Sequence, residues 1–237
     1  MATHTEQDRS RFGSDDLRMP QALRESLVEH LDQLRERYAR RGWGGRVGFG
    51  EHPAVLVIDL ARFWLDPQQQ IGSSLNSVVA GTCRVLRAAR AACIPIFFTT
   101  FDDDPAHPPS PHDQKLALRL GPDVGLFELD PRLERRPTEK LIYKRYASAF
   151  KGTALHEMLA SLAIDTLIVT GISTSHCVYA TCRDATDSFR VIVPREAVGE
   201  RCELMHEVFL FDIDLDLGDV TPVDEVLRHL DSLAARS

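Results

Sequence analysis

Short apolar runs of strand length alternate with helical segments along most of this chain, and that alternation restricts the fold more than any other feature. The clearest runs are residues 54–59 (AVLVID), 94–100 (IPIFFTT) and 166–170 (TLIVT). Between the first two, residues 75–92 repeat apolar side chains at helical spacing. Continuous apolar strands separated by helices predict a parallel sheet covered on both faces. We therefore predict an α/β fold with three layers (α/β/α) around a mostly parallel sheet.

The same patterns divide the chain into three parts. Residues 1–19 are polar without periodicity and predict a disordered or extended tail, whereas residues 20–50 predict an N-terminal helical arm followed by a glycine-rich connector. Residues 51–237 form the α/β domain. Within it we expect further strands at 141–143, 191–193 and 218–220, further helices at 152–162, 203–211 and 223–234, a helix ending near 187, and a proline-rich loop at 101–113.

Charge and cysteine content exclude several classes of protein. Lys and Arg number 28 against 35 Asp and Glu, which gives a net charge of −7. A net acidic surface argues against nucleic acid or an anionic membrane as a partner. Five cysteines without a CxxC pair favour reduced thiols over a disulfide framework, and the polar N-terminus does not resemble a secretory signal. We expect a cytoplasmic protein.

Three residues with ionisable or nucleophilic side chains lie where predicted strands end. Asp59 closes the first strand, Lys144 follows residues 141–143, and Cys177 lies in the turn after residues 166–170. Functional groups of parallel sheets collect at the carboxyl ends of the strands, so one crevice could hold all three. A helix N-terminus and a nearby ammonium both favour a thiolate, which predicts a lowered thiol pKa. A carboxylate could take the thiol proton and pass it to a leaving amine.

Each of these residues alone also has an ordinary structural interpretation. A carboxylate after a strand often caps a loop, a lysine among other basic residues is often solvated, and a free cysteine is often a small buried hydrophobe. The functional interpretation rests on the combination.

The segments around these residues resemble the isochorismatase-like cysteine hydrolases, which include nicotinamidases, N-carbamoylsarcosine amidases and maleamate amidohydrolases. The similar segments are PAVLVIDLARFWLDP with Asp59, KRYASAFKGTAL with Lys144 four residues before Ser148, and IVTGISTSHCVYATCRDA with Cys177. The resemblance extends from about residue 38 to 230. The stretches before Asp59 and near the C-terminus are similar to the N-carbamoylsarcosine amidase and maleamate amidohydrolase branch.

This resemblance implies a mechanism that needs no cofactor. Cys177 would attack the carbonyl carbon of an amide or ureido group, Asp59 would carry the proton to departing ammonia, and Lys144 would hold the aspartate and stabilise the thiolate. The backbone N–H groups of Ser173 and Cys177 would form the oxyanion hole, with a cis peptide between Ile172 and Ser173.

We expect no metal, although nicotinamidases of this family carry one. The candidate ligands in the proline-rich loop lack the metal spacing and a supporting strand or helix. These candidates are Asp102, Asp103, Asp104, His107 and His112.

Substrates of the similar branch carry a carboxylate, so a cationic anchor is expected, and arginine suits it best. The candidate anchors are Arg62, Arg195 and Arg201, and the other candidates for the pocket wall are Phe63, Trp64, Thr174 and Tyr179. Two departures from the branch affect specificity. His176 stands where glycine is common, and Tyr179 stands where the branch has an arginine.

The sequence thus predicts a hydrolase of linear amides with an Asp-Lys-Cys triad, similar to N-carbamoylsarcosine amidase, acting on a small amide or ureido substrate. Three alternatives stay open: a maleamate-type amidase, an isochorismatase-type vinyl ether hydrolase, and a non-catalytic binding module on the same fold. Because the helical arm has no place in a three-layer domain, we also expect a homodimer or homotetramer.

Overall fold

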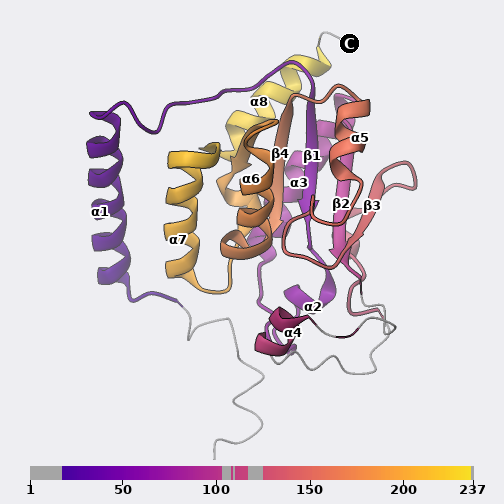
Figure 1. Ribbon diagram of the computed structural model, residues 1–237, viewed down its shortest axis with the longest axis horizontal. Helices are drawn as coiled ribbons and strands as arrows, with labels where there is room; N and C mark the ends of the chain where they lie inside the picture. Colours follow the sequence, from indigo (N-terminus) through magenta and orange to yellow (C-terminus); the bar gives the residue numbers. More distant parts are fainter. Residues whose placement is uncertain (1–17, 103–107, 109, 117–124, 236–237) are drawn as a thin grey trace, which may run out of the picture.

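The computed structural model describes residues 18–102, 108, 110–116 and 125–235 (Figure 1). The predicted N-terminal tail, up to residue 17, lies outside the described residues. The remainder forms a central sheet with helices on both faces, as the alternation of strands and helices predicts. No helix among the described residues is long and apolar enough to cross a membrane.

A seven-stranded sheet forms the centre of the molecule. Its order is β3-β2-β1-β4-β5-β7, with β6 also pairing with β4. Every strand pairing among the described residues is parallel, which confirms the predicted sheet. The bounds are β1 (Pro53–Ile58), β2 (Ile96–Phe101), β3 (Lys140–Lys144), β4 (Thr166–Ile172), β5 (Arg190–Pro194), β6 (Val198–Gly199) and β7 (Asp219–Thr221).

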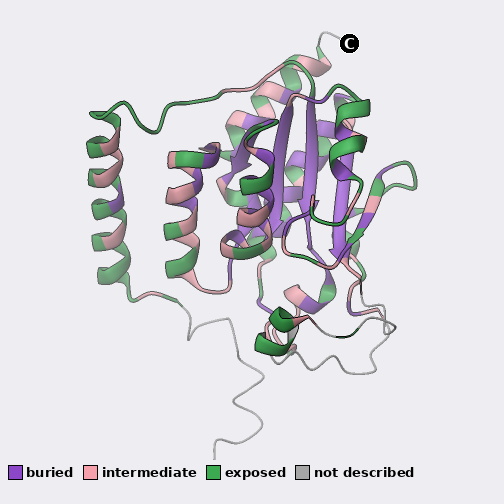
Figure 2. Ribbon diagram, in the orientation of Figure 1, coloured by how far each residue is buried: buried purple, intermediate pink, exposed green. Residues whose placement is uncertain are grey.

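The central strands are apolar on both faces because helices cover both. All residues of β1 are buried, and its alternate side chains enter two separate cores (Figure 2). Full burial of each Val, Leu or Ile contributes about 1.5–3 kcal/mol. One core lies under α3 (Asn76–Ala91) and α8 (Val223–Ala234). The other lies under α5 (Leu155–Ser161), α6 (Tyr179–Ala185) and α7 (Glu203–Asp212).

Several short elements depart from the sequence prediction. The interval 101–113 is not a loop throughout, because α4 (Pro111–Leu116) begins within it, with proline at the first helical position where its missing N–H costs nothing. A short helix, α2 (Arg62–Leu65), follows Asp59. Before α6 the chain forms a π-helical turn, Thr174–Val178, which we call the π turn.

The N-terminal arm consists of α1 (Gln21–Ala39) and the connector 40–50, and α1 stands apart from the sheet beside α7 (Figure 1). Arg35 ties α1 to α7 and to the turn after it, because its guanidinium lies over the Phe211 ring of α7 and its Nε lies 3.3 Å from an oxygen of Asp214, which follows α7. The connector is held by the buried Asp219, which accepts the N–H groups of Val47 and Gly48 at 3.0 and 2.8 Å. The predicted N-terminal helical arm is therefore present as α1.

Candidate active site

Asp59, Lys144 and Cys177 meet at the carboxyl end of the sheet. Asp59 follows β1, Lys144 ends β3, and Cys177 follows β4 in the π turn. Because β3 lies two strands from β1, the long lysine side chain spans the interval. Its Nζ is 2.7 Å from an Asp59 oxygen and 3.4 Å from the Cys177 sulfur. The geometry therefore groups the three residues around one ammonium.

Asp59 is fixed by the strand between β1 and β3. Thr99 of β2 donates its hydroxyl to Asp59 Oδ1 at 2.7 Å, and the Thr99 carbonyl accepts the Asp59 N–H at 3.2 Å. The aspartate is 3% exposed and has a left-handed backbone with φ of 50°. No sequence motif identifies Thr99 as a site residue. The role of Thr99 follows only from the strand order, which places β2 between β1 and β3.

Lys144 remains an ammonium in spite of its burial. Burial alone would lower its pKa, but the Asp59 carboxylate and then Cys177 raise the pKa of Lys144 above its usual value. The ammonium also donates to the carbonyls of Tyr146 and Ala147, at 3.1 Å each. A cation with four such partners keeps a defined position between carboxylate and sulfur.

The resting Cys177 is a neutral thiol. Burial raises the pKa of Cys177 to about 12, and the Asp59 carboxylate adds to the rise, while Lys144 opposes it. The expectation of a lowered thiol pKa is therefore wrong for this site. Desolvation and a facing carboxylate outweigh the ammonium, because both disfavour a second negative charge.

A cavity of about 150 Å³ opens over these three residues. This is small beside the roughly 300–1,000 Å³ of pockets for drug-sized ligands. Two predicted pocket residues, Trp64 and Arg201, line it. Arg145, for which the sequence predicts no role, supplies a second arginine to the wall. The cavity thus fits a small polar molecule.

Two predicted pocket residues of the nucleophile segment turn away from the cavity. The Thr174 hydroxyl pairs with Nδ1 of His206 at 2.9 Å, and burial lowers the pKa of His206. The Tyr179 hydroxyl donates to Asp212 at 2.6 Å, and this bond raises the tyrosine pKa to about 12. Both residues anchor the segment to α7 and its neighbourhood. Neither residue lines the cavity, although the sequence predicts both in the pocket wall.

The remaining predicted pocket residues also lie outside the cavity wall. Phe63 is buried and packs edge-on against Trp64, so it supports the wall from behind. Arg195 forms an ion pair with Glu207, and Arg62 is exposed at the start of α2. Of the three predicted arginine anchors, Arg201 is the one that the geometry brings to the cavity.

Two histidines close one side of the cavity. His112 of α4 stacks on His176 of the π turn, with ring centroids 4.8 Å apart and planes 20° apart. Burial lowers the pKa of His176, and the charges of His112 and Lys144 lower it further. The sequence predicts His112 in a loop, as a candidate metal ligand, and no periodicity predicts the helix that carries it. No group of three or more His, Cys, Asp or Glu within the described ranges could hold a metal, and Asp103, Asp104 and His107 lie outside them.

The backbone at the start of the π turn has the expected form. The Ile172–Ser173 peptide is cis, as the family resemblance implies. The Ser173 carbonyl accepts the N–H groups of His176 and Val178 at 2.9 and 3.1 Å, and Ser173 and Cys177 both line the cavity.

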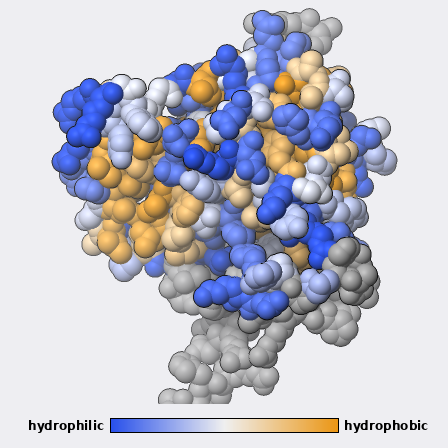
Figure 3. Space-filling model, in the orientation of Figure 1, coloured by the Kyte–Doolittle hydropathy of each residue, from blue (hydrophilic) through white to orange (hydrophobic). Residues whose placement is uncertain are grey.

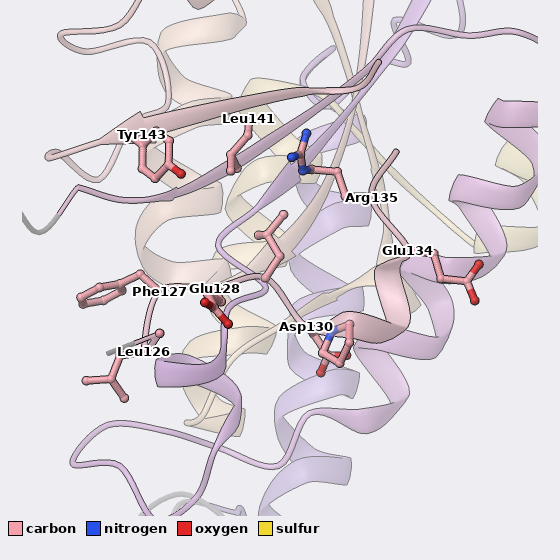
Figure 4. Close-up of a pocket in the computed structure, with 11 residues that line it drawn as sticks. Leu126, Phe127, Glu128, Asp130, Glu134, Arg135, Leu141 and Tyr143 are labelled. Atoms are coloured by element: carbon pink, nitrogen blue, oxygen red, sulfur yellow. The ribbon is translucent and has the colours of Figure 1, made fainter. Parts of the chain in front are cut away.

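A second hollow lies beside the edge strand β3 (Figure 4). Leu141 and Tyr143 of β3 form one side, and the segment with Phe127 and Glu128 forms the other. Its described lining contains neither cysteine nor histidine, so the cavity over Cys177 is the candidate active site.

Comparison with known proteins places the chain in a family. A family model described as the isochorismatase domain matches residues 53–225. The chain belongs to the isochorismatase family. Within it, an N-carbamoylsarcosine amidase of Arthrobacter is 35% identical over 83% of this chain and 78% of its own length. A maleamate amidohydrolase of Pseudomonas putida is 33% identical, over 81% and 93%.

Solved structures of isochorismatase-like proteins share the fold. A cysteine hydrolase of Pseudomonas syringae has a TM-score of 0.68 at 22% identity, covering 77% of this chain and 93% of its own. This likeness supports the predicted fold, and the two relatives support the predicted family branch. At the level of reaction class, the relatives support amide hydrolysis.

Proposed function

We propose that this isochorismatase-family protein is a cysteine-dependent amidohydrolase that cleaves a C–N bond of a small amide or ureido substrate and releases ammonia. The observation that carries the proposal is the Lys144 ammonium bridging the Asp59 carboxylate and the Cys177 thiol beneath a small cavity. The amidohydrolase names of the two relatives support the same reaction class.

In the first half-reaction the thiol loses its proton as it attacks. Because the thiol pKa is raised to about 12, a free thiolate is scarce near neutral pH. Asp59 accepts the proton while the sulfur bonds to the carbonyl carbon, which makes it the general base. Lys144 stabilises negative charge on both the sulfur and the carboxylate during this transfer.

The tetrahedral intermediate then collapses to a thioester. The N–H groups of Ser173 and Cys177 are the proposed donors to its oxyanion, each worth about 3–4 kcal/mol in comparable acyl transfers. Protonated Asp59 returns the proton to the leaving nitrogen, and ammonia departs. Asp59 then takes a proton from water as the water oxygen attacks the thioester carbon. The C–S bond breaks, Asp59 returns the proton to the departing sulfur, and the acid product leaves the restored thiol.

The substrate is proposed to carry a carboxylate, as the name of the N-carbamoylsarcosine amidase relative suggests. Arg201 and Arg145 on the cavity wall support an anionic group. Arg195 is engaged by Glu207, so we retain Arg201 as the anchor. The 33% identical maleamate amidohydrolase favours a maleamate-type amide as the second candidate.

Ammonia release from a panel of amides tests the proposal. The panel contains N-carbamoylsarcosine, N-carbamoyl amino acids, maleamate and nicotinamide, each with wild type, Cys177→Ala and the control Cys93→Ala, which removes an exposed thiol. We expect at least one carboxylate-bearing substrate to release ammonia, with activity reduced to background in Cys177→Ala and retained in the control. Turnover by Cys177→Ala at the wild-type rate would exclude nucleophilic catalysis by this thiol.

A further inference from the structure

The carboxylate of Glu200 is buried against the π turn. Its side chain is 2% exposed. Oε2 accepts both the N–H and the hydroxyl of Ser175, at 3.0 and 2.6 Å, and Oε1 accepts the N–H of Arg201 at 2.9 Å. The Arg201 guanidinium lies 4.0 Å from Glu200 Oε1, which is the upper distance limit for an ion pair. A desolvated carboxylate is costly unless such donors surround it, so these bonds fix its position firmly.

Glu200 joins two walls of the candidate active site. Ser175 lies between Ser173 and Cys177, the two residues whose N–H groups are the proposed oxyanion donors. Gly199, the preceding residue, pairs with Ile172 of β4, so the sheet itself sets Glu200 beside the start of the π turn. Ser175 and Arg201 both line the cavity, whereas Glu200 is not among its lining residues.

We propose that Glu200 is a positioning residue, which holds the π turn through Ser175 and so directs the Ser173 and Cys177 N–H groups at the reacting carbonyl. This inference rests on the proposed amide hydrolysis. The hydrogen bond that the Arg201 N–H donates to Glu200 also fixes the position of Arg201, the proposed anchor, relative to the π turn. Backbone donors of an oxyanion hole contribute only when their direction is fixed, and the carboxylate fixes it from outside the cavity.

A double-mutant cycle tests this role. The variants are Glu200→Gln, which replaces one acceptor oxygen with a donor, Ser175→Ala, and their combination. Glu196→Gln is the matched control, since Glu196 caps α8 by accepting the Val223 N–H at 2.7 Å. We expect kcat to fall at least about tenfold in Glu200→Gln with KM changed less than about threefold, because misdirected oxyanion donors act on the transition state.

Ser175→Ala should lose less, the double variant should be no worse than Glu200→Gln, and the control should keep its kcat within about twofold. Urea unfolding shows that each variant is folded under assay conditions. A kcat within twofold of wild type in folded Glu200→Gln would overturn the inference. So would independent losses that multiply in the double variant, or an equal loss in Glu196→Gln.

Alkylation of Cys177 by iodoacetamide separates this inference from the proposed function. Since the π turn sets the distance of the sulfur from Lys144 and Asp59, Glu200→Gln should shift the pH profile of alkylation and Glu196→Gln should not. If wild type hydrolyses none of the amides, the proposed function fails and alkylation alone decides. An unchanged profile in Glu200→Gln would then overturn positioning of the turn.

Discussion

Asp59 and Lys144 act in opposite directions on the Cys177 thiol. The carboxylate raises the thiol pKa and the ammonium lowers it, with burial adding the largest rise. The protein therefore keeps the nucleophile protonated at rest and places a base against it. Deprotonation then accompanies attack on a bound carbonyl.

Replacing Asp59 should separate thiol acidity from turnover. In Asp59→Asn we expect faster alkylation of Cys177 at pH 8, because the variant removes a charge that disfavours the thiolate. Ammonia release should fall by about 100-fold or more, since the proton acceptor is lost. Mass spectrometry of the Cys177 peptide and the ammonia assay measure the two effects. Slower alkylation in this variant would contradict the electrostatic account, and Asp66→Asn, outside the cavity wall, is the control.

The pH dependence of alkylation should follow the raised thiol pKa. Below a pKa of about 12 the thiolate fraction rises tenfold with each pH unit. We expect the logarithm of the alkylation rate of Cys177 to increase steadily from pH 7 to 10 without a plateau. A rate independent of pH between 6 and 8 would instead indicate a thiolate–ammonium ion pair. The exposed Cys93 provides an internal comparison in the same digest.

At the scale of elements, sequence patterns identified the main strands and helices, including the three-residue β7, but missed α2, α4, β6 and the π turn. β4 extends two residues beyond its prediction because Gly171 and Ile172 pair with β6, a two-residue strand too short to have a periodicity. The helix that carries His112 has six residues and the same limitation.

The candidate site divides in the same way. The sequence predicts Asp59, Lys144 and Cys177 from their places at strand ends and from local motifs that resemble the family. Thr99 and Glu200 cannot be predicted from local motifs, because each contacts the site from a segment that is distant in the sequence and is brought there by the strand order. Thr174 and Tyr179 are predicted to line the pocket, whereas their hydroxyl groups bond to His206 and Asp212 of α7.

Close packing of β4 on β1 makes Gly171 essential for the sheet that supports the site. A Cβ there would overlap the carbonyl oxygen of Ile58, and the residue has φ of 108°. We expect Gly171→Ala to lower the free energy of unfolding by about 3 kcal/mol or more. Gly48→Ala is the matched control, since Gly48 has φ of 65° with open space around it and should lose about 1 kcal/mol. Urea unfolding measures both, and equal losses would contradict the steric argument.

At the scale of the whole molecule, the N-terminal arm leaves apolar surface uncovered. Figure 3 shows apolar side chains gathered over α1 and α7, and Leu23, Leu204, Met205 and Val208 are exposed there. Exposed apolar patches commonly mark association surfaces. The predicted division at residues 20–50 and the predicted homodimer or homotetramer are consistent with this surface and stay predictions.

Light scattering at micromolar concentration tests the association. We expect an oligomer for wild type and a smaller species for Val208→Lys, because a charge on an apolar interface must be desolvated. Leu162→Lys, at an exposed leucine after α5, should leave the oligomer intact. A monomeric wild type would contradict the prediction.

The pairing of β1 with β4 has a consequence for the newly made protein. Residues 53–58 cannot meet residues 166–171 until the ribosome has synthesised more than a hundred intervening residues, which takes on the order of ten seconds. Cys177 is made only after residues 166–171, so it leaves the ribosome as an ordinary solvated thiol with a pKa near 8.5 before the strands pair around it. Oxidants and electrophiles therefore have a brief period of access during translation, which ends when the sheet closes around the sulfur.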